Sequence, residues 1–400
     1  MTVNYLPVRE YIQKQFINFP WASETQTEAI CTTVDHLLAG RRKGRKSLLR
    51  SGMTLLSDRQ LQYQLRQSLY YLDCMKDQQS EYNNNFDLRK IHQLSFDDII
   101  KSRTGKNVYA SSYQYNHSKS SVEWGQTVVD MVLVTDHVLG VDYQVYLPQS
   151  YLERNKRSEN EFETKIEITK QLFNHHCDRL VSQNIPKEKI WVSVDCWYPS
   201  EDLIAAFRQK EVNIAMGLKK DTRCNLFGRL VRLDNVFKLE DPWKHRTTKR
   251  SGKKVFFQEK TLNLNRQGRC KVFAVRRGDD KRIRYYGTNL FQISFDRFLE
   301  RLSSHWQVET MHHDIKQYFG FDKCVTGSEI LNNLHWNLCY LIYHLFRQYQ
   351  WDESCKGSFL TISQLVELYC YQYDEERSLK CFSTPSKRAL SRKRLIGGLC

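Results

Sequence analysis

The order of β-rich and helical segments between residues 94 and 218 constrains the fold most. Three β-rich segments come first, near residues 94–100, 127–134 and 140–147, and we expect them to form an antiparallel meander. Helical and short apolar patterns then alternate, at residues 163–183, 190–195, 200–210 and 213–218. This order is typical of an α/β domain with a mixed sheet.

The rest of the chain divides into regions of different pattern. Residues 5–82 are helical in period, and a basic turn from Arg41 to Arg50 suits either a DNA backbone or simple exposure to solvent. We expect five regions: a helical N-terminal DNA-binding region (1–85), the first part of the core (86–225), a basic β-rich insertion (226–290), the completion of the core (291–350), and a helical C-terminal region with a basic tail (351–400).

Basic residues outnumber acidic ones by 61 to 45 in this 400-residue chain, and the excess is clustered. Residues 241–290 hold fifteen Lys or Arg against four Asp or Glu, and seven basic residues but no acidic one follow Glu376. Such clusters favour a polyanion partner, most simply nucleic acid. A basic surface that only aids solubility is the alternative.

The twelve cysteines stand singly, without a CxxC pair, so we expect reduced thiols in a cytoplasmic protein rather than disulfides. The adjacent histidines at 175–176 and 312–313 point in different directions on a helix, which argues against a zinc centre. The sequence has no 18-residue apolar run and does not begin like a signal peptide. We expect neither secretion nor a membrane span.

Residues 297–320 have a helical period and end at Gly320. Steps of three and four residues place a row of side chains on one face of this helix: Leu302, His305, Glu309, His312 and Lys316. A carboxylate and an amine therefore project together. An exposed salt-bridge face is the simpler interpretation of this spacing taken alone.

Acidic residues at the ends of two predicted strands add to this helix. Asp97 and Asp98 lie on the first strand, Asp195 closes the strand at 190–195, and Glu309 lies on the helix. Hard oxygen ligands of this kind hold pairs of Mg²⁺ ions about 3.5–4 Å apart beside a phosphodiester. An Asp at a strand end is more often a turn or cap residue, so the acids alone do not identify an enzyme.

Four segments resemble successive blocks of bacterial insertion-sequence transposases of the DDE class, most closely the fourth insertion-sequence family: SFDDII (95–100), YNHSKSSVEWGQTVVDMVLV (115–134), WVSVDCWY (191–198) and HWQVETMHHDIKQYFGF (305–321). That family has a Glu on a helix seven residues before a Lys. The resemblance implies a ribonuclease-H-like core in which Asp98, Asp195 and Glu309 are catalytic and bind two Mg²⁺ ions, with Mn²⁺ as a substitute. Asp97 is the rival for the first position.

The resemblance also implies which residues contact DNA. Lys316 would bind a phosphate near the scissile end, and Arg301 could reach the same phosphate. Trp197 or Trp306 could stack against a displaced base.

Three positions depart from the family pattern. Ile99 stands where a small hydroxyl residue follows the first acid, and Leu302 and His305 stand where the family has a Tyr and an Arg. A largely neutral imidazole binds phosphate less well than a guanidinium. We therefore expect His305 to be a weakened DNA contact, and His305→Arg to raise cleavage.

Lys and Arg alternate with Val, Phe and Tyr in the expected β-rich insertion, which predicts one packed face and one cationic face. We expect the cationic face to clamp DNA through a row of exposed side chains: Lys253, Lys271, Arg276, Arg282 and Arg284.

Together these features predict a DNA transposase that cleaves at transposon ends and transfers the 3′-hydroxyl into target DNA. We expect DNA as partner, a homodimer in the synaptic complex, no membrane association, and a bacterial cytoplasmic protein associated with the nucleoid. Two alternatives stay open: a catalytically impaired DNA-binding descendant of a transposase, and a related nuclease without strand transfer.

Overall fold

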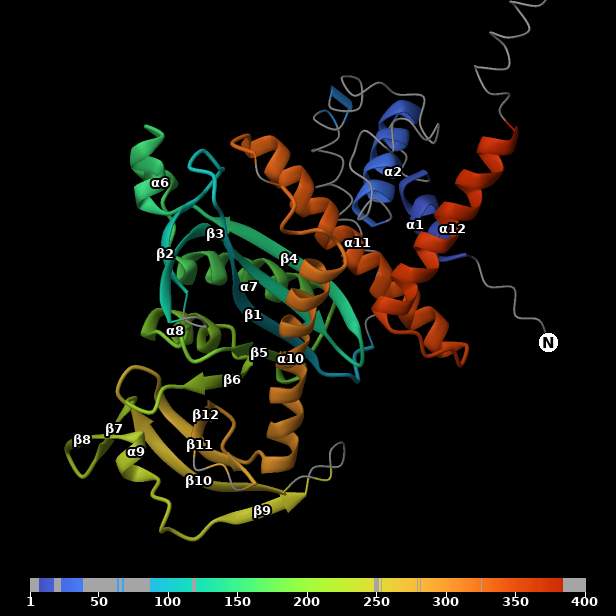
Figure 1. Ribbon diagram of the computed structural model, residues 1–400. Helices are drawn as coiled ribbons and strands as arrows, with labels where there is room; N and C mark the ends of the chain where they lie inside the picture. Colours follow the sequence, from blue (N-terminus) through green and yellow to red (C-terminus); the bar gives the residue numbers. More distant parts are fainter. Residues whose placement is uncertain are drawn as a thin grey trace, which may run out of the picture. The chain divides into compact units, whose positions relative to one another are not determined.

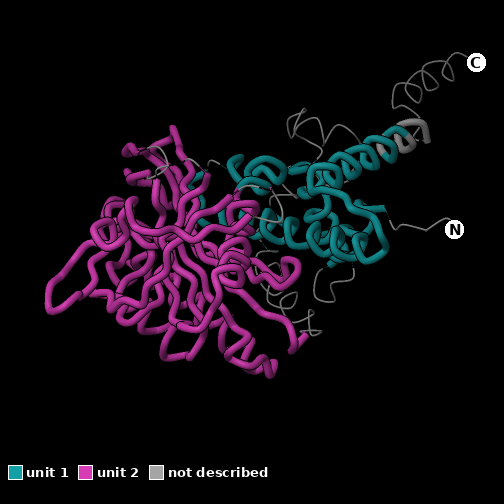
Figure 2. Tube along the Cα trace, turned by 90° about the horizontal axis from the view of Figure 1, so that it is seen from below, with its two compact units in different colours: residues 1–81, 313–400 teal, residues 82–312 magenta. Residues whose placement is uncertain are grey.

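The computed structural model describes residues 7–17, 23–38, 63–64, 67, 87–116, 120–247, 252, 254–278, 280, 282–324 and 326–383. The chain forms two compact units, which Figure 2 shows in different colours. One, the α/β unit, holds residues 82–312; the other, the helical unit, combines residues 1–81 with residues 313–400. The boundary falls within one long helix, α10 (Phe295–Gln317).

Strand β1 (His92–Ser102) lies inside the mixed sheet of the α/β unit. It pairs antiparallel with β3 (Ser121–Val134) and parallel with β5 (Ile190–Val194). Strand β4 (Val138–Tyr146) pairs antiparallel with β3, and β6 (Asn213–Leu218) pairs parallel with β5. The expected mixed α/β fold is confirmed, including the antiparallel meander of β1, β3 and β4.

The same sheet continues past β6 through six more strands. They are β7 (Arg223–Leu226), β8 (Arg229–Arg232), β9 (Lys244–Thr247), β10 (Lys254–Leu264), β11 (Gly268–Arg277) and β12 (Arg284–Thr288). Because β12 pairs antiparallel with β6, the sheet order is β2-β3-β1-β5-β6-β12-β11-β10-β7-β8, with β4 beside β3 and β9 beside β10. The short strand β2 (Ser112–Asn116), which the sequence patterns do not predict, pairs with the start of β3.

Helices α7 (Lys165–Ser182) and α8 (Glu201–Gln209) cover one face of the sheet (Figure 1). Helix α7 begins at a capping box, in which the Thr164 hydroxyl and the Glu167 carboxylate each accept a hydrogen bond from the other residue's backbone N–H. The apolar core between these helices and the sheet includes Leu94, Phe96, Ile168, Phe173 and Phe207. Shorter helices lie in the connections: α6 (Gln149–Arg154), η2 (Glu159–Glu161), η3 (Lys187–Lys189) and α9 (Leu233–Val236).

Helix α10 crosses the other face of the sheet (Figure 1), and stacked aromatic rings anchor its first turn. Phe295 stacks on Phe257 of β10 with 3.8 Å between ring centroids, and Phe298 stacks on Phe273 of β11 at 4.7 Å. All four side chains are buried. The strands that follow β6 therefore set where α10 begins, and its later turns pass over β1 and β5. The predicted helix end is confirmed near Gly320, whose φ is +68°.

The helical unit joins the two ends of the chain. Helix α1 contacts α2, α11 and α12. Arg9 donates from Nε and Nη2 to the two carboxylate oxygens of Asp35 at 3.0 and 2.9 Å, and the Tyr369 hydroxyl donates to the same carboxylate at 2.8 Å. These contacts link α1 (Val8–Ile17), α2 (Glu24–Leu38) and α12 (Ile362–Ser383). Helix α11 (Glu329–Cys355) also belongs to the described part of this unit.

The basic turn at residues 41–50 and the basic tail from Ser386 lie outside the described residues. The five regions expected from the sequence stay a prediction. Among the helices that the structure describes, none has the length and apolar character of a membrane span.

Candidate active site

A buried polar network holds α10 over the parallel strands. The Gln93 side-chain amide on β1 donates to the Ser193 hydroxyl at 2.9 Å and to the Arg301 backbone carbonyl at 2.8 Å. The Ser193 hydroxyl donates in turn to Ser95 at 2.8 Å. Gln93, Ser95 and Ser193 are each at most 1% exposed. Because buried polar groups need partners, these bonds favour a single position of α10 on the sheet.

That position brings α10 side chains to Asp97 on β1. Asp97, Glu309 and His312 each offer a ligand atom, and these atoms all lie within 4.8 Å of one another. Glu309 and His312 are three residues apart, so they share one face of the helix. We call these three residues the Asp97 cluster. Asp97 and Glu309 are 212 positions apart in the sequence, and the packing of α10 on β1 brings them together.

The Asp97 carboxyl group is in a poor environment for a negative charge. Burial raises its pKa to about 8; the nearby His312 opposes this shift, and the neighbouring Asp98 and Asp130 add to it. Glu309, by contrast, is exposed at the open side of the cluster. A half-buried carboxyl group beside other acids is balanced well by a cation, and two carboxylates with an imidazole are suitable ligands for a divalent one.

His312 is held in the cluster by a second acid, Asp130 of β3. Its Nε2 lies 2.8 and 3.0 Å from the two carboxylate oxygens of Asp130, while its Nδ1 lies 3.9 Å from Oδ2 of Asp97. Asp130 is fully buried, and it is the residue directly opposite Asp97 in the pairing of β3 with β1. The sheet register therefore places both acids against the same helix turn.

Asp195 follows β5 at the same edge of the sheet. Phe96 of β1 pairs with Val194 of β5, so Asp97 and Asp195 each come one residue after this pair. Asp195 is exposed, and its charge acts on the His305 imidazole of α10. It therefore neighbours the Asp97 cluster without being part of that group of three.

Asp98 lies on the other face of the sheet. Side chains alternate along β1, so Asp98 shares the face of Phe96, which packs in the core under α7. Its carboxylate forms an ion pair with Lys165 of α7 at 2.7 Å and accepts a hydrogen bond from the Tyr198 hydroxyl at 3.1 Å. The expectation that Asp98 points toward Glu309 is therefore wrong: the acid that does so is Asp97.

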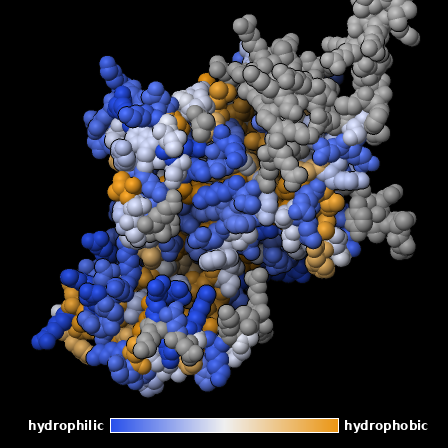
Figure 3. Space-filling view, in the orientation of Figure 1, coloured by the Kyte–Doolittle hydropathy of each residue, from blue (hydrophilic) through white to orange (hydrophobic). Residues whose placement is uncertain are grey.

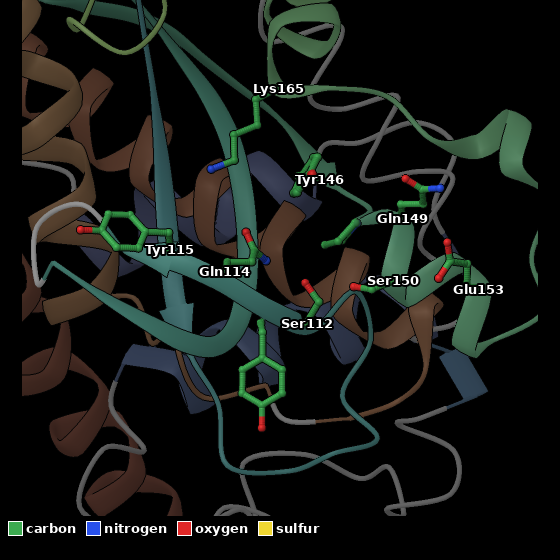
Figure 4. A pocket seen from close by; sticks show the side chains of 10 residues that line it. Ser112, Gln114, Tyr115, Tyr146, Gln149, Ser150, Glu153 and Lys165 are labelled. Atoms are coloured by element: carbon green, nitrogen blue, oxygen red, sulfur yellow. The ribbon is translucent and has the colours of Figure 1, made fainter. Parts of the chain in front are cut away.

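A pocket of about 540 Å³ opens beside this ion pair (Figure 4). Its lining is mainly polar and aromatic: Ser112, Tyr113, Gln114, Tyr115, Tyr146, Pro148, Gln149, Ser150, Glu153 and Lys165. Lys165 thus borders the pocket and neutralises Asp98 at once. Asp98 thus has a lysine ammonium as its partner, whereas Asp97 faces the His312 imidazole.

Comparison with known protein families matches residues 136–345 to the transposase DDE domain. The match covers more than half of the 400 residues. The chain belongs to this family of transposases. Among curated proteins, none matches the chain significantly.

The transposase match includes Asp195, Glu309 and Lys316, and it starts after β1. The match therefore covers neither Asp97 nor Asp98, and geometry separates the two: Asp97 lies beside Glu309, and Asp98 pairs with Lys165. Transposases of this class act on DNA, so the exposed residues around the cluster are the ones to consider for DNA contacts.

Both expected base-stacking residues are exposed on the transposase surface. Trp197 is 50% exposed and Trp306 is 65% exposed, and the Lys219 ammonium lies 3.6 Å from the Trp197 ring centroid. Lys316 is exposed on the last turn of α10. Arg301 differs, because only 16% of its side chain is exposed and burial lowers its pKa. A DNA contact by Arg301 would need this side chain to move outward.

His305 faces the sheet rather than a phosphate. Its Nδ1 lies 3.0 Å from the Ser193 hydroxyl, and burial lowers its pKa to about 4, a shift that Asp195 partly opposes. The ring is therefore neutral at physiological pH and belongs to the polar network under α10. This geometry argues against the expected role of His305 as a weakened phosphate contact.

The expected cationic face of the β-rich segment is only partly formed. Arg282 and Arg284 are exposed. Arg276 instead lies 4.3 Å from the Phe256 ring centroid, and Lys271 donates to the Ile293 carbonyl at 2.9 Å. Lys253 lies outside the described residues. On the face shown in Figure 3, hydrophilic and hydrophobic residues alternate over these strands instead of forming a uniform polar surface.

Sequence reasoning missed Asp130 and the orientation of His312. A signal for Asp130 was present, since it is the one acid within the apolar run TVVDMVLV at 127–134. A buried acid in such a run requires a partner. His312 was noticed on the helix face, but its partner lies 182 residues away, and only the sheet register reveals it.

Proposed function

We propose that this transposase cleaves DNA at the ends of its element and joins the released 3′-hydroxyl to target DNA, with Asp97, Asp195 and Glu309 as its catalytic acids. The observation that carries the proposal is the meeting of Asp97 with Glu309 and His312, at the sheet edge where Asp195 also lies. The family match supports the reaction class, and the position of the acids supports a phosphoryl-transfer site.

The residues present suit divalent ions, Mg²⁺ with Mn²⁺ as a substitute, bound by these carboxylates. Bound ions would supply Lewis-acid activation of the attacking oxygen and stabilisation of the leaving one. Asp97, half-buried and flanked by Asp98 and Asp130, gains most from such a cation. Glu309 and Asp195 are exposed, so they can face both the ion and the scissile phosphodiester. Two ions, as in other sites built from three acids, are part of the proposal.

Lys316, Trp197 and Trp306 are proposed to contact DNA. Their exposure allows an ammonium to meet a phosphate and an indole to stack on a displaced base. Arg282 and Arg284 are proposed as non-specific phosphate contacts, because both side chains are exposed on the basic strand segment.

The test is metal-dependent cleavage of DNA that carries the element ends, with Asp195→Asn and Glu309→Gln. Each variant is expected to lose cleavage by at least about 100-fold while DNA binding changes little, because affinity depends on Lys and Arg. The matched control is Glu300→Gln, an exposed acid on the same helix, which should cleave normally.

The products and the wild-type activity distinguish the alternatives. Joined products are expected; nicking without joining would identify a nuclease, and DNA binding without any metal-dependent nicking would identify a catalytically impaired descendant. Robust cleavage by Asp195→Asn or Glu309→Gln would remove that residue from the site.

A further inference from the structure

We propose that His312 is a nitrogen ligand of the metal site and that Asp130 is the buried residue that orients it. This inference deepens the proposed function and rests on it. It assigns the site a mixed donor set of carboxylate oxygen from Asp97 and Glu309 and imidazole nitrogen from His312. A site made of acids alone would not hold a nitrogen donor.

The hydrogen bonds of His312 determine which nitrogen faces the acids. Its Nε2 lies 2.8 and 3.0 Å from the two oxygens of Asp130, and a carboxylate only accepts hydrogen bonds. The proton of a neutral imidazole therefore lies on Nε2. The lone pair is then on Nδ1, the nitrogen that lies 3.9 Å from Oδ2 of Asp97. The imidazole thus directs its ligand atom toward the carboxylates.

The spacing of the donors suits a single ion. Ligand atoms about 2.0–2.2 Å from a metal lie up to about 4 Å from one another. The three ligand atoms of the Asp97 cluster are all within 4.8 Å of one another, so a small inward movement completes the site. Glu309 and His312 also form a Glu-x-x-His sequence on one helix, a spacing that aims both side chains at a metal in carboxylate-rich helical sites.

Asp130 has the features of a partner that orients a metal ligand. It is fully buried, and burying an ionised carboxylate is unfavourable unless it is well paired. Histidines that bind metals generally donate their other ring N–H to a carboxylate or carbonyl, which fixes the tautomer and the ring orientation. Asp130 meets this requirement from β3, where it lies directly opposite Asp97 in the strand pairing. The register of β1 with β3 therefore places the proposed ligand Asp97 next to the residue that orients His312.

The donor set predicts a metal preference. Carboxylates alone suit Mg²⁺ and Ca²⁺, whereas an imidazole shifts preference toward Mn²⁺ and the later transition metals. We therefore expect the protein to bind Mn²⁺ more tightly than Mg²⁺, and His312→Asn to reduce that difference. A histidine with a purely structural role would leave the ratio of the two affinities unchanged.

The decisive experiment is pulsed EPR of Mn²⁺ bound to the full chain without DNA. The wild-type spectrum should show hyperfine coupling to a nitrogen nucleus, and the coupling should change when histidine carrying the heavier nitrogen isotope is incorporated. The coupling should disappear in His312→Asn. It should persist in His313→Asn, the matched control, whose side chain is 66% exposed.

Asp130→Asn should weaken Mn²⁺ binding by roughly 10- to 100-fold, as other changes of metal-orienting partners do. If His312→Asn does not fold, absence of coupling in the labelled wild-type protein still overturns the inference, and coupling that Asp130→Asn weakens supports it, because Asp130 contacts the His312 ring.

Three outcomes would overturn the inference. In the first, the wild type binds Mn²⁺ without nitrogen coupling, and Glu309→Gln weakens this binding. The acids would then hold the ion without His312, and the proposed transposase function would stand. Coupling that persists in His312→Asn would assign it to another histidine. Absence of Mn²⁺ binding altogether would contradict both this inference and the metal site of the proposed function.

Discussion

Asp97 and Asp98 are consecutive residues of β1 whose carboxyl groups lie on opposite faces of the sheet. Asp98 is neutralised by Lys165 of α7 at 2.7 Å, whereas Asp97 faces α10, with its Oδ2 3.9 Å from Nδ1 of His312. The protein thus supplies a cation to one acid, and a bound metal would supply it to the other. This difference between neighbours makes Asp97 the proposed first catalytic acid.

The metal-free protein should become more stable when Asp97 is replaced by Asn. The folded-state pKa of Asp97 is raised to about 8, so the folded protein binds this proton more tightly than the unfolded chain. Stability from this group therefore falls as the pH rises from about 4 to about 8. The gain in Tm for Asp97→Asn should be near zero at about pH 4 and largest above about pH 8, where each kcal/mol adds about 2–4 °C.

Thermal unfolding in the presence of a chelator measures this effect, with Asp98→Asn as its counterpart. Asp98 has an ion pair to lose, so its replacement should lower Tm at neutral pH. A destabilised Asp97→Asn protein above pH 8 would show that the Asp97 charge is already compensated without metal.

Phe298→Ala should impair cleavage without touching the acids. The Phe298 ring is fully buried and stacks on Phe273 of β11, which anchors the start of α10. Loss of the ring should cost about 3–5 kcal/mol of unfolding free energy and loosen the helix that carries Glu309. Denaturant unfolding and single-turnover cleavage measure the two effects. Phe227→Ala, at a fully exposed ring on the β7–β8 turn, is the control and should change neither.

His305→Arg should lower both stability and cleavage. The imidazole is neutral, since burial lowers its pKa to about 4, and its Nδ1 contacts the Ser193 hydroxyl at 3.0 Å. A permanently charged, longer side chain would have to be accommodated in the polar network under α10. Melting temperature and the rate of end cleavage report the outcome. Faster cleavage would instead favour the phosphate contact expected from the family pattern.

Arg282 and Arg284 should contribute non-specific DNA affinity. Replacing both by Ala should reduce the slope of log binding constant against log salt by up to about 0.9 for each phosphate that these arginines neutralise, equally for all sequences. Fluorescence anisotropy across a salt series measures this slope. Arg276→Ala is the comparison, because that guanidinium packs on the Phe256 ring and should affect stability more than binding. An unchanged slope in the double variant would leave these arginines a role in solubility only.

Local patterns predicted much of the α/β unit. The helical period at 163–183 corresponds to α7 (Lys165–Ser182), and the apolar run at 213–218 is β6. The alternation of side chains along β1 also distinguishes Asp97 from Asp98. Leu94 and Phe96 are apolar, so Asp98 shares their core-facing side, and Asp97 must face the other way. The expectation of Asp98 as the first acid followed the family pattern instead of this alternation.

Other features depend on contacts between distant segments and could not be predicted. The partnership of Asp130 with His312 spans 182 residues and needs the β1–β3 register and the path of α10 at once. The association of α1 with α12 likewise follows from tertiary packing, including the ion pair of the buried Arg9 of α1 with Glu376 of α12. The alternation of residues along the strand predicted an exposed Lys271. Its ammonium instead pairs with Glu259 at 2.9 Å, which balances its charge.

The most direct test of the account compares Asp97→Asn with Asp98→Asn in Mg²⁺-dependent cleavage of DNA carrying the element ends. The two changes are chemically identical and one residue apart, so only the face of the sheet differs. We expect Asp97→Asn to abolish cleavage, by at least about 100-fold, and folded Asp98→Asn to remain within about tenfold of the wild type. Loss of cleavage in Asp98→Asn with retained cleavage in Asp97→Asn would contradict the assignment of the active site to the α10 face.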